Sequence, residues 1–351
     1  MKDNIYVIKL WSNVLLDDWG INELVVSNVV KSVNFLVENW IKVLIVSSWS
    51  VALWKKNIWL TKINWLSNIE WEQIFSSLWQ VSLINFYQNY FNKFNINVSQ
   101  ALLTRKDFSD RKRYNSMKNV LLKSLELGVI PIINENDVLS QEELDFSDND
   151  ELSALLAAMI WADKLIILSN IDGLYDKFPW WKLSKEVNEI NDETYSMVWE
   201  VKSSLWKWWM ASKLNTAWLL LDLWIDLYLW NWKKEDTIKN IFLWNNPGTL
   251  FKSISWKKVD SIRKWLKAWA VPKWKIFVSN IISDLLKQWK RASLLSIWIE
   301  KIEKEFSKKD VVEVCDINWE SIWYWISKMN SAEIDKNINK IVIHTDYFIR
   351  N

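Results

Sequence analysis

Residues 43–52 read VLIVSSWSVA, an apolar run followed by small residues that are interrupted by Trp49. The apolar run predicts a buried strand, and the small residues predict a turn into a following helix. Such a turn needs a bare backbone or a positive φ, which glycine provides without strain and tryptophan does not. Trp49 therefore stands where an α/β protein requires glycine.

The whole chain shows the same exchange of glycine for tryptophan. Its 351 residues include 30 Trp and only 4 Gly, whereas about 25 Gly are ordinary at this length. Tryptophan is even doubled in loop contexts, at Trp180-Trp181 and Trp208-Trp209. We interpret the gene as one whose UGA codons are read as glycine in its own cell and as tryptophan in the printed sequence. Trp265, in RKWL, is the best candidate for a genuine tryptophan.

The alternative is a protein truly rich in tryptophan, such as a sugar-binding or membrane-interface protein. Binding aromatics of that kind gather on one face of the molecule. Here the tryptophans follow turn positions through the chain, which favours recoding.

Composition excludes several classes of protein. With 44 basic and 42 acidic residues, the net charge of +2 gives no global field that attracts nucleic acid or membranes. The single cysteine, Cys315, excludes a disulfide framework and a cysteine metal cluster. The single histidine, His344, is predicted in a terminal strand rather than a metal site. With no signal peptide pattern and no run of ~18 apolar residues, we expect a cytoplasmic protein without a membrane partner or a protein-bound metal.

Short runs rich in Val, Ile and Leu alternate with amphipathic stretches through the first 250 residues. This alternation predicts a three-layer α/β sandwich with a mainly parallel, open sheet. Beyond Phe251 a basic connector leads into short apolar runs, which predict a small β-barrel domain. We therefore expect domains at 1–256 and 257–351. The predicted strands are 6–10, 43–47, 98–103, 129–133, 164–168 and 225–229; the helices are 21–37, 71–94, 111–127 and 150–160; the later apolar runs are 275–278, 311–314, 321–326 and 340–343.

Ligands of an open α/β sheet bind beyond the carboxyl ends of its strands, so the residues after each strand are informative. Lys9 stands beside a turn, where a lysine and outward backbone N–H groups suit a phosphate. Residues 47–52 open a helix whose N-terminus can hold an anion. Residues 206–213, WKWWMASK, become GKGGMASK with glycine restored, which predicts a glycine loop followed by a helix that carries lysine. Other strand ends carry NEND at 134–137, FSDND at 146–150 and SNIDG at 169–173.

Each of these segments is weak evidence alone, because acidic runs often cap helices and helix lysines are usually solvated. The order in which these segments follow one another along the chain is more specific than any single segment. The chain resembles the glutamate 5-kinases of the amino-acid kinase family over nearly all of its first 250 residues. The resemblance rests on VIKLWS, IVSSWSVALW, ALLTRKDFSDRKRY, VIPIINENDV, FSDNDELSALLA, LIILSNIDGLYD and WKWWMASK. The tail, with KRASLLSIWI, KEFSKKDVVEV and IVIHTDYF, is similar to a PUA domain.

The resemblance implies ATP-dependent phosphorylation of the γ-carboxylate of L-glutamate at the entry to proline biosynthesis, with Mg²⁺ carried on the phosphates. It implies that Lys9 and Lys213 stabilise the transferred phosphoryl group and that Asp150 holds these lysines in place. It also implies proline as a feedback inhibitor and a homo-oligomer. The implied glutamate-binding residues are Ser48, Asp137 and Asn149; the implied ATP-binding residues are Lys9, Ser169, Asn170, Lys207, Trp208, Trp209, Met210, Ala211, Ser212 and Lys213.

Some features depart from the family pattern or leave alternatives open. Asn170 stands where aspartate is common and Lys207 where threonine is common, and RKRYNSMKN at 111–119 has also drifted. The acceptor could be another amino acid or a nucleoside monophosphate. The basic connector at 257–267 could serve RNA binding by the tail, but basic runs are usually solvated and the chain is nearly neutral, so we expect no RNA partner.

Overall fold

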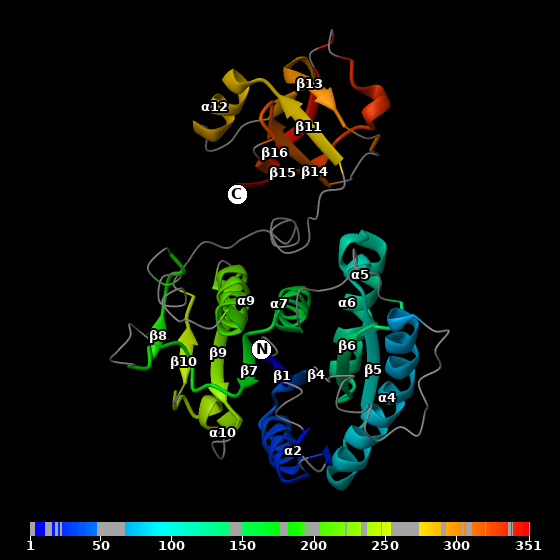
Figure 1. The fold of residues 1–351 in the computed structure, drawn as a ribbon, viewed down its shortest axis with the longest axis vertical. Helices are drawn as coiled ribbons and strands as arrows, with labels where there is room; N and C mark the ends of the chain where they lie inside the picture. Colours follow the sequence, from blue (N-terminus) through cyan, green and yellow to red (C-terminus); the bar gives the residue numbers. More distant parts are fainter. Residues whose placement is uncertain are drawn as a thin grey trace. The chain divides into compact units, whose positions relative to one another are not determined.

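In a computed structural model the chain forms two units, Met1–Trp256 and Lys257–Asn351 (Figure 1). Each is described by itself below. Among the described residues, no helix combines the length and the apolar character needed to cross a membrane. The structure describes residues 4–10, 16–17, 20–21, 23–47, 67–139, 149–175, 182–191, 194, 204–221, 223–232, 237–246, 248–253, 274–288, 293–303, 305–306, 311–319, 321–335, 338 and 340–350.

The first unit is built on an eight-stranded sheet in the order β5-β6-β4-β1-β7-β9-β10-β8. All neighbours in this sheet are parallel except β9 and β10, which are antiparallel. The prediction of a mainly parallel, open sheet is confirmed. The strands are β1 (Ile5–Leu10), β4 (Lys42–Ser47), β5 (Val98–Leu103), β6 (Ile130–Glu135), β7 (Lys164–Ser169), β8 (Glu186–Val187), β9 (Asp226–Asn231) and β10 (Thr249–Phe251), with a separate hairpin of β2 (Leu16–Asp17) and β3 (Gly20–Ile21).

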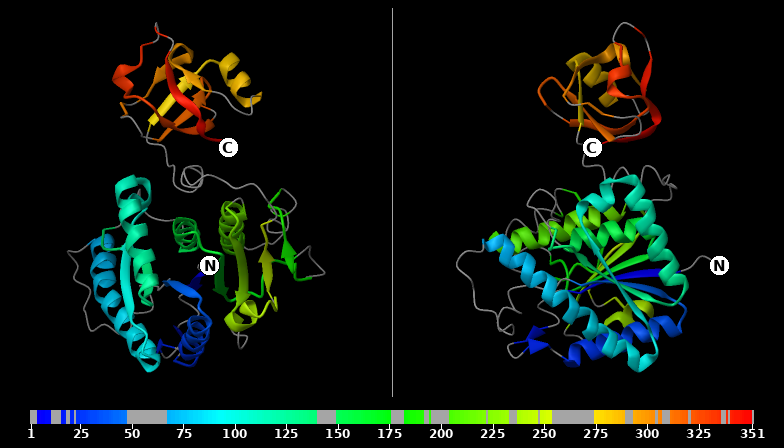
Figure 2. Two further views of the ribbon diagram at one scale, coloured as in Figure 1. Left: turned by 180° about the vertical axis from the view of Figure 1, so that it is seen from behind. Right: turned by 90° about the vertical axis from the view of Figure 1, so that its right-hand side faces the viewer.

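Helices cover both faces of this sheet (Figures 1 and 2). On one face, α2 (Glu23–Glu38), α4 (Asn68–Phe91) and α10 (Thr237–Phe242) pack over an apolar core that alternate strand residues complete. The other face carries α6 (Arg111–Glu126), α7 (Asn149–Ile160) and α9 (Ser204–Leu221), while α5 (Arg105–Ser109) and η1 (Asn92–Phe94) are short connections. The central strand β1 therefore has both of its side-chain faces buried under helices.

Observed boundaries differ from the predicted ones by a few residues, for local reasons. β5 agrees to the residue, whereas β6 continues past Ile133 to Glu135 because its last residues pair with Leu102 and Leu103 of β5. α4 begins earlier than predicted, since Ser67 caps it and the Glu70 carboxylate accepts from the Ser67 N–H in return.

The second unit is a six-stranded sheet in the order β12-β16-β15-β14-β11-β13. Its pairs are antiparallel except β11 and β14, and one face covers an apolar core with α12 (Asn280–Gln288). Within the described residues β12 and β13 are edges, so closure into a PUA-like barrel stays a prediction. His344 lies in the terminal strand. The elements are β11 (Trp274–Val278), β12 (Leu294–Leu295), β13 (Ile299–Ile302), β14 (Val311–Asp316), β15 (Ser321–Ser327), β16 (Ile341–Arg350), η2 (Ser296–Trp298) and η3 (Ser331–Glu333).

Candidate active site

The central strand β1 brings a lysine into the interior of the first unit. Lys9 pairs with Val46 of β4 on one side and with Ile167 of β7 on the other. Its side chain is buried, at 1% exposure. Because an isolated buried ammonium group is very costly, a lysine at this position requires a charged partner.

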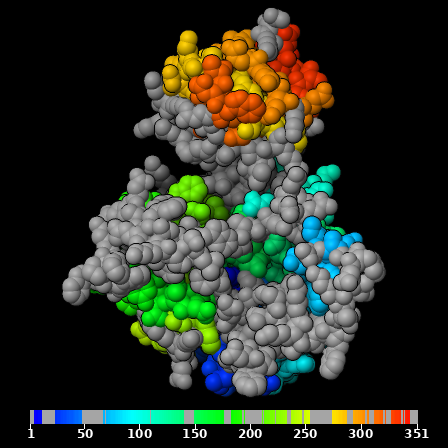
Figure 3. Space-filling view, in the orientation of Figure 1, coloured from blue at the N-terminus to red at the C-terminus, as the bar shows by residue number. Residues whose placement is uncertain are grey.

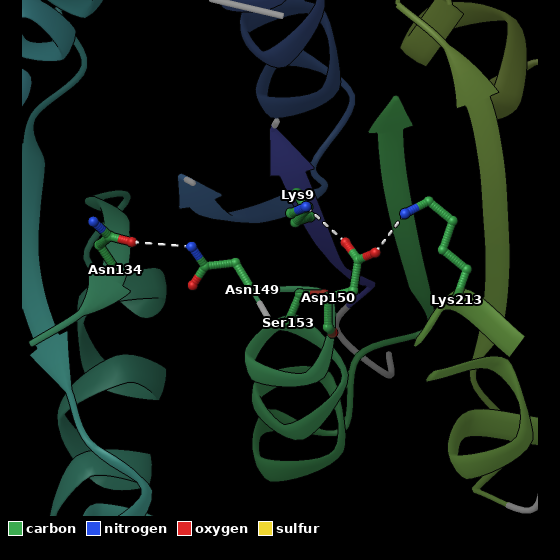
Figure 4. A network of polar contacts seen from close by, with 6 residues as sticks. All are labelled: Lys9, Asn134, Asn149, Asp150, Ser153 and Lys213. Carbon is green, nitrogen blue, oxygen red and sulfur yellow. Dashed lines mark hydrogen bonds and ion pairs between the residues drawn. The ribbon is translucent and has the colours of Figure 1, made fainter. Parts of the chain in front are cut away.

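That partner is Asp150, in the first turn of α7. Asp150 Oδ1 lies 2.7 Å from Lys9 Nζ, and Asp150 Oδ2 accepts a hydrogen bond of 2.7 Å from Lys213 Nζ on α9 (Figure 4). Asp150 and Lys213 are both fully buried. The positive end of the α7 dipole also favours a carboxylate in this turn. β1, α7 and α9 thus assemble a Lys9–Asp150–Lys213 cluster from three distant parts of the sequence.

The cluster keeps Asp150 ionised. Burial by itself raises the pKa of this carboxyl, but Lys213 and Lys9 outweigh burial and hold the pKa well below its usual value of 3.8. A carboxylate with so low a pKa, and with an ammonium group on each oxygen, is a poor general base. The chemical role that remains for Asp150 is to fix the positions of two lysines.

The charges of the three side chains in this cluster do not cancel. Two ammonium groups and one carboxylate sum to one positive charge, and all three side chains are buried. A buried excess of positive charge is stabilised by an anion that approaches the lysines. The site is therefore suited to a phosphoryl group.

Two asparagines extend the site on the β6 side of the cluster. Asn149, the residue before Asp150, donates from Nδ2 to Asn134 Oδ1 across a long 3.4 Å (Figure 4). Asn134 is buried near the end of β6. Asn149 Oδ1 is shielded from solvent and has no hydrogen-bond partner among the described residues. A loosely held amide with a buried, unsatisfied oxygen is able to turn toward a polar ligand.

The end of β6 carries another predicted glutamate-site residue. Asp137 is half-buried in the turn that follows β6, and this turn is tied to β5 by the Asn136 N–H donating to Leu103 O at 2.8 Å. Ser48 lies outside the described residues. The residue before it, Ser47, ends β4 and forms a buried 3.1 Å hydrogen bond with the Tyr87 hydroxyl of α4. Because β4 and β6 are parallel neighbours, Asp137 lies at the same edge of the sheet as the end of β4.

Polar residues also meet at the ends of β7 and β9, on the other side of β1. Ser169 at the end of β7 lies opposite Asn231 at the end of β9 in the parallel strand pair. The Ser169 Oγ accepts a hydrogen bond from the Ile171 N–H at 3.1 Å. The Asn231 amide donates to Asp172 Oδ1 at 2.9 Å, and Trp232 Nε1 donates to Asn170 Oδ1 at 2.6 Å. This pairing brings the predicted nucleotide residues Ser169 and Asn170 beside Asn231, which sequence reasoning did not select.

The glycine loop predicted at 206–213 for the glycine-restored sequence is not formed by the printed chain. These residues lie within α9, which is helical from Ser204 to Leu221. Tryptophan has a higher helix propensity than glycine, because glycine loses more backbone entropy when a helix forms. The printed sequence therefore forms helix at residues where glycine would favour a loop. Met210 and Lys213 are buried and Ser212 is half-buried; for Lys207, Trp208, Trp209 and Ala211 only the helical backbone is described.

An ion pair holds the start of α7. Arg105 Nη2 lies 2.7 Å from both carboxylate oxygens of Glu151, the residue after Asp150. Arg105 begins α5, directly beyond the end of β5. The pair thus anchors the helix turn that carries Asn149 and Asp150 to the neighbouring strand end.

Comparisons with known proteins agree with this geometry. The chain matches the family described as "Amino acid kinase family" over residues 4–223. Curated proteins named "Glutamate 5-kinase" are 34% identical in Bacteroides thetaiotaomicron, covering 97% of this chain and 96% of the relative, and 31% identical in Pelagibacter ubique, covering 96% and 91%. The chain belongs to the amino acid kinase family. A further "Glutamate 5-kinase", from Dehalococcoides mccartyi strain CBDB1, is 30% identical and covers 96% of this chain and 92% of itself.

Solved structures show the amino acid kinase fold alone. The UMP kinase of Ureaplasma parvum superposes with a TM-score of 0.50 at 16% identity, covering 72% of this chain and 100% of its own. An isopentenyl phosphate kinase gives a TM-score of 0.51 at 13% identity, covering 71% and 100%. The family match at residues 4–223 lies in the first unit, which holds the site described above.

Two features of this amino acid kinase site were missed at the level of sequence. Asn134 was visible as the first residue of NEND, but only the fold shows that it is buried against Asn149. Nothing in the sequence marked Asn231 as a site residue, because an asparagine after an apolar run is common in turns. Both become visible when parallel strand ends are brought side by side.

Proposed function

We infer that this amino acid kinase family member transfers the γ-phosphoryl group of ATP to the γ-carboxylate of L-glutamate, giving L-glutamyl 5-phosphate in the first step of proline biosynthesis. The observation that carries the chemistry is the buried Lys9–Asp150–Lys213 cluster at the sheet centre. The acceptor is supported by relatives that share the name "Glutamate 5-kinase" over nearly the whole chain. An alternative acceptor, another amino acid or a nucleoside monophosphate, has no such support.

The reaction needs positioning and charge neutralisation rather than a base. A γ-carboxylate oxygen attacks the γ-phosphorus, the bond from that phosphorus to the β,γ-bridging oxygen breaks, and ADP leaves with the electron pair. The acceptor is already an anion at neutral pH, so no proton has to be removed. This requirement agrees with Asp150, whose pKa is held low by two lysines. The obstacle is repulsion between two anions, which positive charge from Lys9 and Lys213 relieves.

Glutamate recognition is assigned to residues on the β6 side of the cluster. Asp137 would pair with the α-ammonium group, while Asn149 and Ser48 would hydrogen-bond carboxylate oxygens. The long Asn149–Asn134 contact and the unsatisfied Asn149 Oδ1 support an amide that changes partner when substrate enters.

The nucleotide is assigned to the β7 and α9 side. Ser169, Asn170 and residues 207–213 would contact ATP there. Mg²⁺ would arrive on the phosphates, held mainly by phosphate oxygens and water, and it would neutralise phosphate charge. Asp150 is a poor metal ligand because both of its oxygens already face ammonium groups.

Assembly and regulation follow the family resemblance. We place the protein in the cytoplasm, as a homo-oligomer with proline as feedback inhibitor. Apolar side chains at helical spacing on α4, Ile74, Leu78 and Val81, are 38%, 44% and 59% exposed, and α4 reaches the surface in Figure 3. This stripe supports a contact between copies of the chain.

The second unit is assigned as a PUA-like domain with a regulatory or assembly role. Its six short strands around one apolar core support a small β module. RNA binding is the alternative, and salt-dependent retention of RNA by the full chain is the measurement that would favour it.

The test of the reaction is product trapping. Purified protein with ATP, Mg²⁺ and hydroxylamine should form a hydroxamate and ADP in equal amounts with L-glutamate, because an acyl phosphate reacts with hydroxylamine. L-Aspartate, N-acetyl-L-glutamate and UMP serve as matched acceptors. Faster ADP formation with any of these than with L-glutamate would refute the proposed acceptor.

A further inference from the structure

Most of the left-handed backbone conformations in the described residues fall on tryptophan. Six non-glycine residues have positive φ, between 56° and 69°, and five of them are tryptophan. The sixth, Asn95, is of a type that tolerates this region, whereas a bulky residue there is strained. The tryptophans are Trp40 (63°), Trp161 (60°), Trp224 (62°), Trp244 (62°) and Trp319 (69°).

Four of these tryptophans end helices in a hydrogen-bond pattern that ordinarily uses glycine. After α2, the N–H of Trp40 donates to Val37 O and that of Ile41 to Leu36 O, both at 3.0 Å. Trp224 and Trp244 donate in the same way after α9 and α10. In both cases the N–H of the residue after the tryptophan donates to the carbonyl oxygen five residues earlier in the chain. After α7, the Ala162 N–H donates to Ala157 O at 2.9 Å, with Trp161 between.

The chain contains its own control for this motif. After α6, the N–H of Gly128 donates to Leu125 O and that of Val129 to Ser124 O, at 3.3 and 2.9 Å. Gly128 has φ of 73°, close to the values at the four tryptophans. The same local structure is therefore made once with glycine and four times with tryptophan.

The indoles at these five positions are exposed to solvent to a large extent. Their exposed fractions are 92% for Trp40, 78% for Trp244, 54% for Trp319, 44% for Trp161 and 40% for Trp224. Lysines lie over three of the rings, Trp161, Trp244 and Trp319, and Phe277 also packs edge-on against Trp319.

Buried tryptophans give an independent sign of the same exchange. The indole N–H groups of Trp71, Trp79 and Trp230 are buried and have no hydrogen-bond partner among the described residues. Buried indole N–H groups usually donate a hydrogen bond to a nearby acceptor.

We propose that Trp40, Trp161, Trp224, Trp244 and Trp319 are glycine in the protein that its own cell makes, each encoded by UGA read as glycine. We call that protein the cellular form. The assignment rests on backbone conformation and hydrogen bonding, and it is independent of the reaction proposed above.

The same exchange at 206, 208 and 209 has a consequence for the site. Three glycines among four residues oppose helix formation, so in the cellular form α9 begins near Met210 and the residues before it form a loop. A glycine loop before a helix exposes backbone N–H groups that suit phosphates. This part of the inference also rests on the proposed phosphoryl transfer.

The decisive test is the codon at each position. The gene should carry UGA at the five positions and at 206, 208 and 209, and peptide mass mapping of protein from the source cell should give glycine there. UGG codons, or tryptophan in the mapped peptides, would overturn the proposal.

A recombinant test probes the conformational argument alone. In the printed chain, each of the five tryptophans is replaced in turn by glycine and by alanine. Glycine should raise the folding equilibrium constant by about tenfold over alanine at each site, since only alanine has the Cβ that opposes positive φ.

The control is Trp218, in the helical part of α9 and 48% exposed, where the order should reverse because alanine is the better helix former. Alanine equal to glycine at the five sites would refute the conformational argument. If the printed chain is insoluble, the five glycine substitutions together should restore soluble protein, and five alanine substitutions should not. Soluble protein with five alanines but not with five glycines would also refute the conformational argument.

Discussion

The sharpest test of the site is Asp150→Asn, introduced into the cellular form. The change keeps the shape of the side chain and removes its negative charge. Lys9 and Lys213 are then left on either side of a neutral amide, each buried at 1% exposure or less. Breaking a buried ion pair by removing one partner costs about 3–5 kcal/mol. A typical domain has only about 5–15 kcal/mol of stability, so the loss should be large and measurable.

The pH dependence of this loss is fixed by the sign of the pKa shift. The folded-state pKa of Asp150 lies below its usual value of 3.8. Its stabilisation is therefore complete above about pH 5, declines below the unfolded-state pKa, and is lost as the pH falls through the folded-state pKa. Urea unfolding curves of wild type and Asp150→Asn should be separated by a constant free energy from pH 5 to 8 and should converge in acid.

A matched control is Glu126→Gln on α6. Glu126 pairs with Lys123 at the surface, where the two side chains are 50% and 73% exposed. The same carboxylate-to-amide change there should cost about 0–1 kcal/mol. Asp150→Asn should also lower kcat by at least about 100-fold, since the lysines lose their positions. Equal effects of the two substitutions on stability, or a kcat near wild type for Asp150→Asn, would refute the role of the cluster.

Four further substitutions test the roles of single residues in the cellular form. Lys9→Ala or Lys213→Ala should lower kcat by orders of magnitude while glutamate binding, measured calorimetrically, changes little, because these charges act on the transition state; normal turnover in both would refute the assignment. Asp137→Ala should raise the KM for glutamate much more than that for ATP, and an equal rise in steady-state assays would place Asp137 elsewhere. Glu151→Gln should raise the KM for glutamate several-fold by loosening the Arg105 anchor, with Tm lowered by only a few degrees; an unchanged KM would reduce the ion pair to a surface contact.

Much of the fold could be predicted from local sequence. The continuous apolar runs of β1, β4 and β7 identify buried parallel strands, because both faces of such strands must be apolar. The short strands β10 and β8 at one end of the sheet could not be predicted, since two or three residues carry no periodicity. The registers that join β10 to β9 and β8 to β10 come from packing alone.

Predictions of the site divide in the same way. The sequence points to Lys9, Asp150 and Lys213 as site residues, and the structure places the ammonium group of each lysine 2.7 Å from a different carboxylate oxygen of Asp150. The glycine loop before Lys213 was predicted from the restored sequence, and the printed sequence makes a helix there instead. That difference is a property of the residue type, because glycine opposes the helical turns that tryptophan allows.

The sequence by itself determined the alternation of strands and helices, the family, and the mismatch between tryptophan and its turn contexts. These are local properties, set by hydrophobic period and by the backbone preference of single residues. Only the tertiary structure decided that Asp150 lies between two lysines, that Asn134 meets Asn149, and that five tryptophans end helices or turns with positive φ. The ion pairs of Asp150 depend on a fold that brings residues more than 50 positions apart to one edge of a sheet, and the tryptophan conformations depend on the dihedral angles that packing imposes.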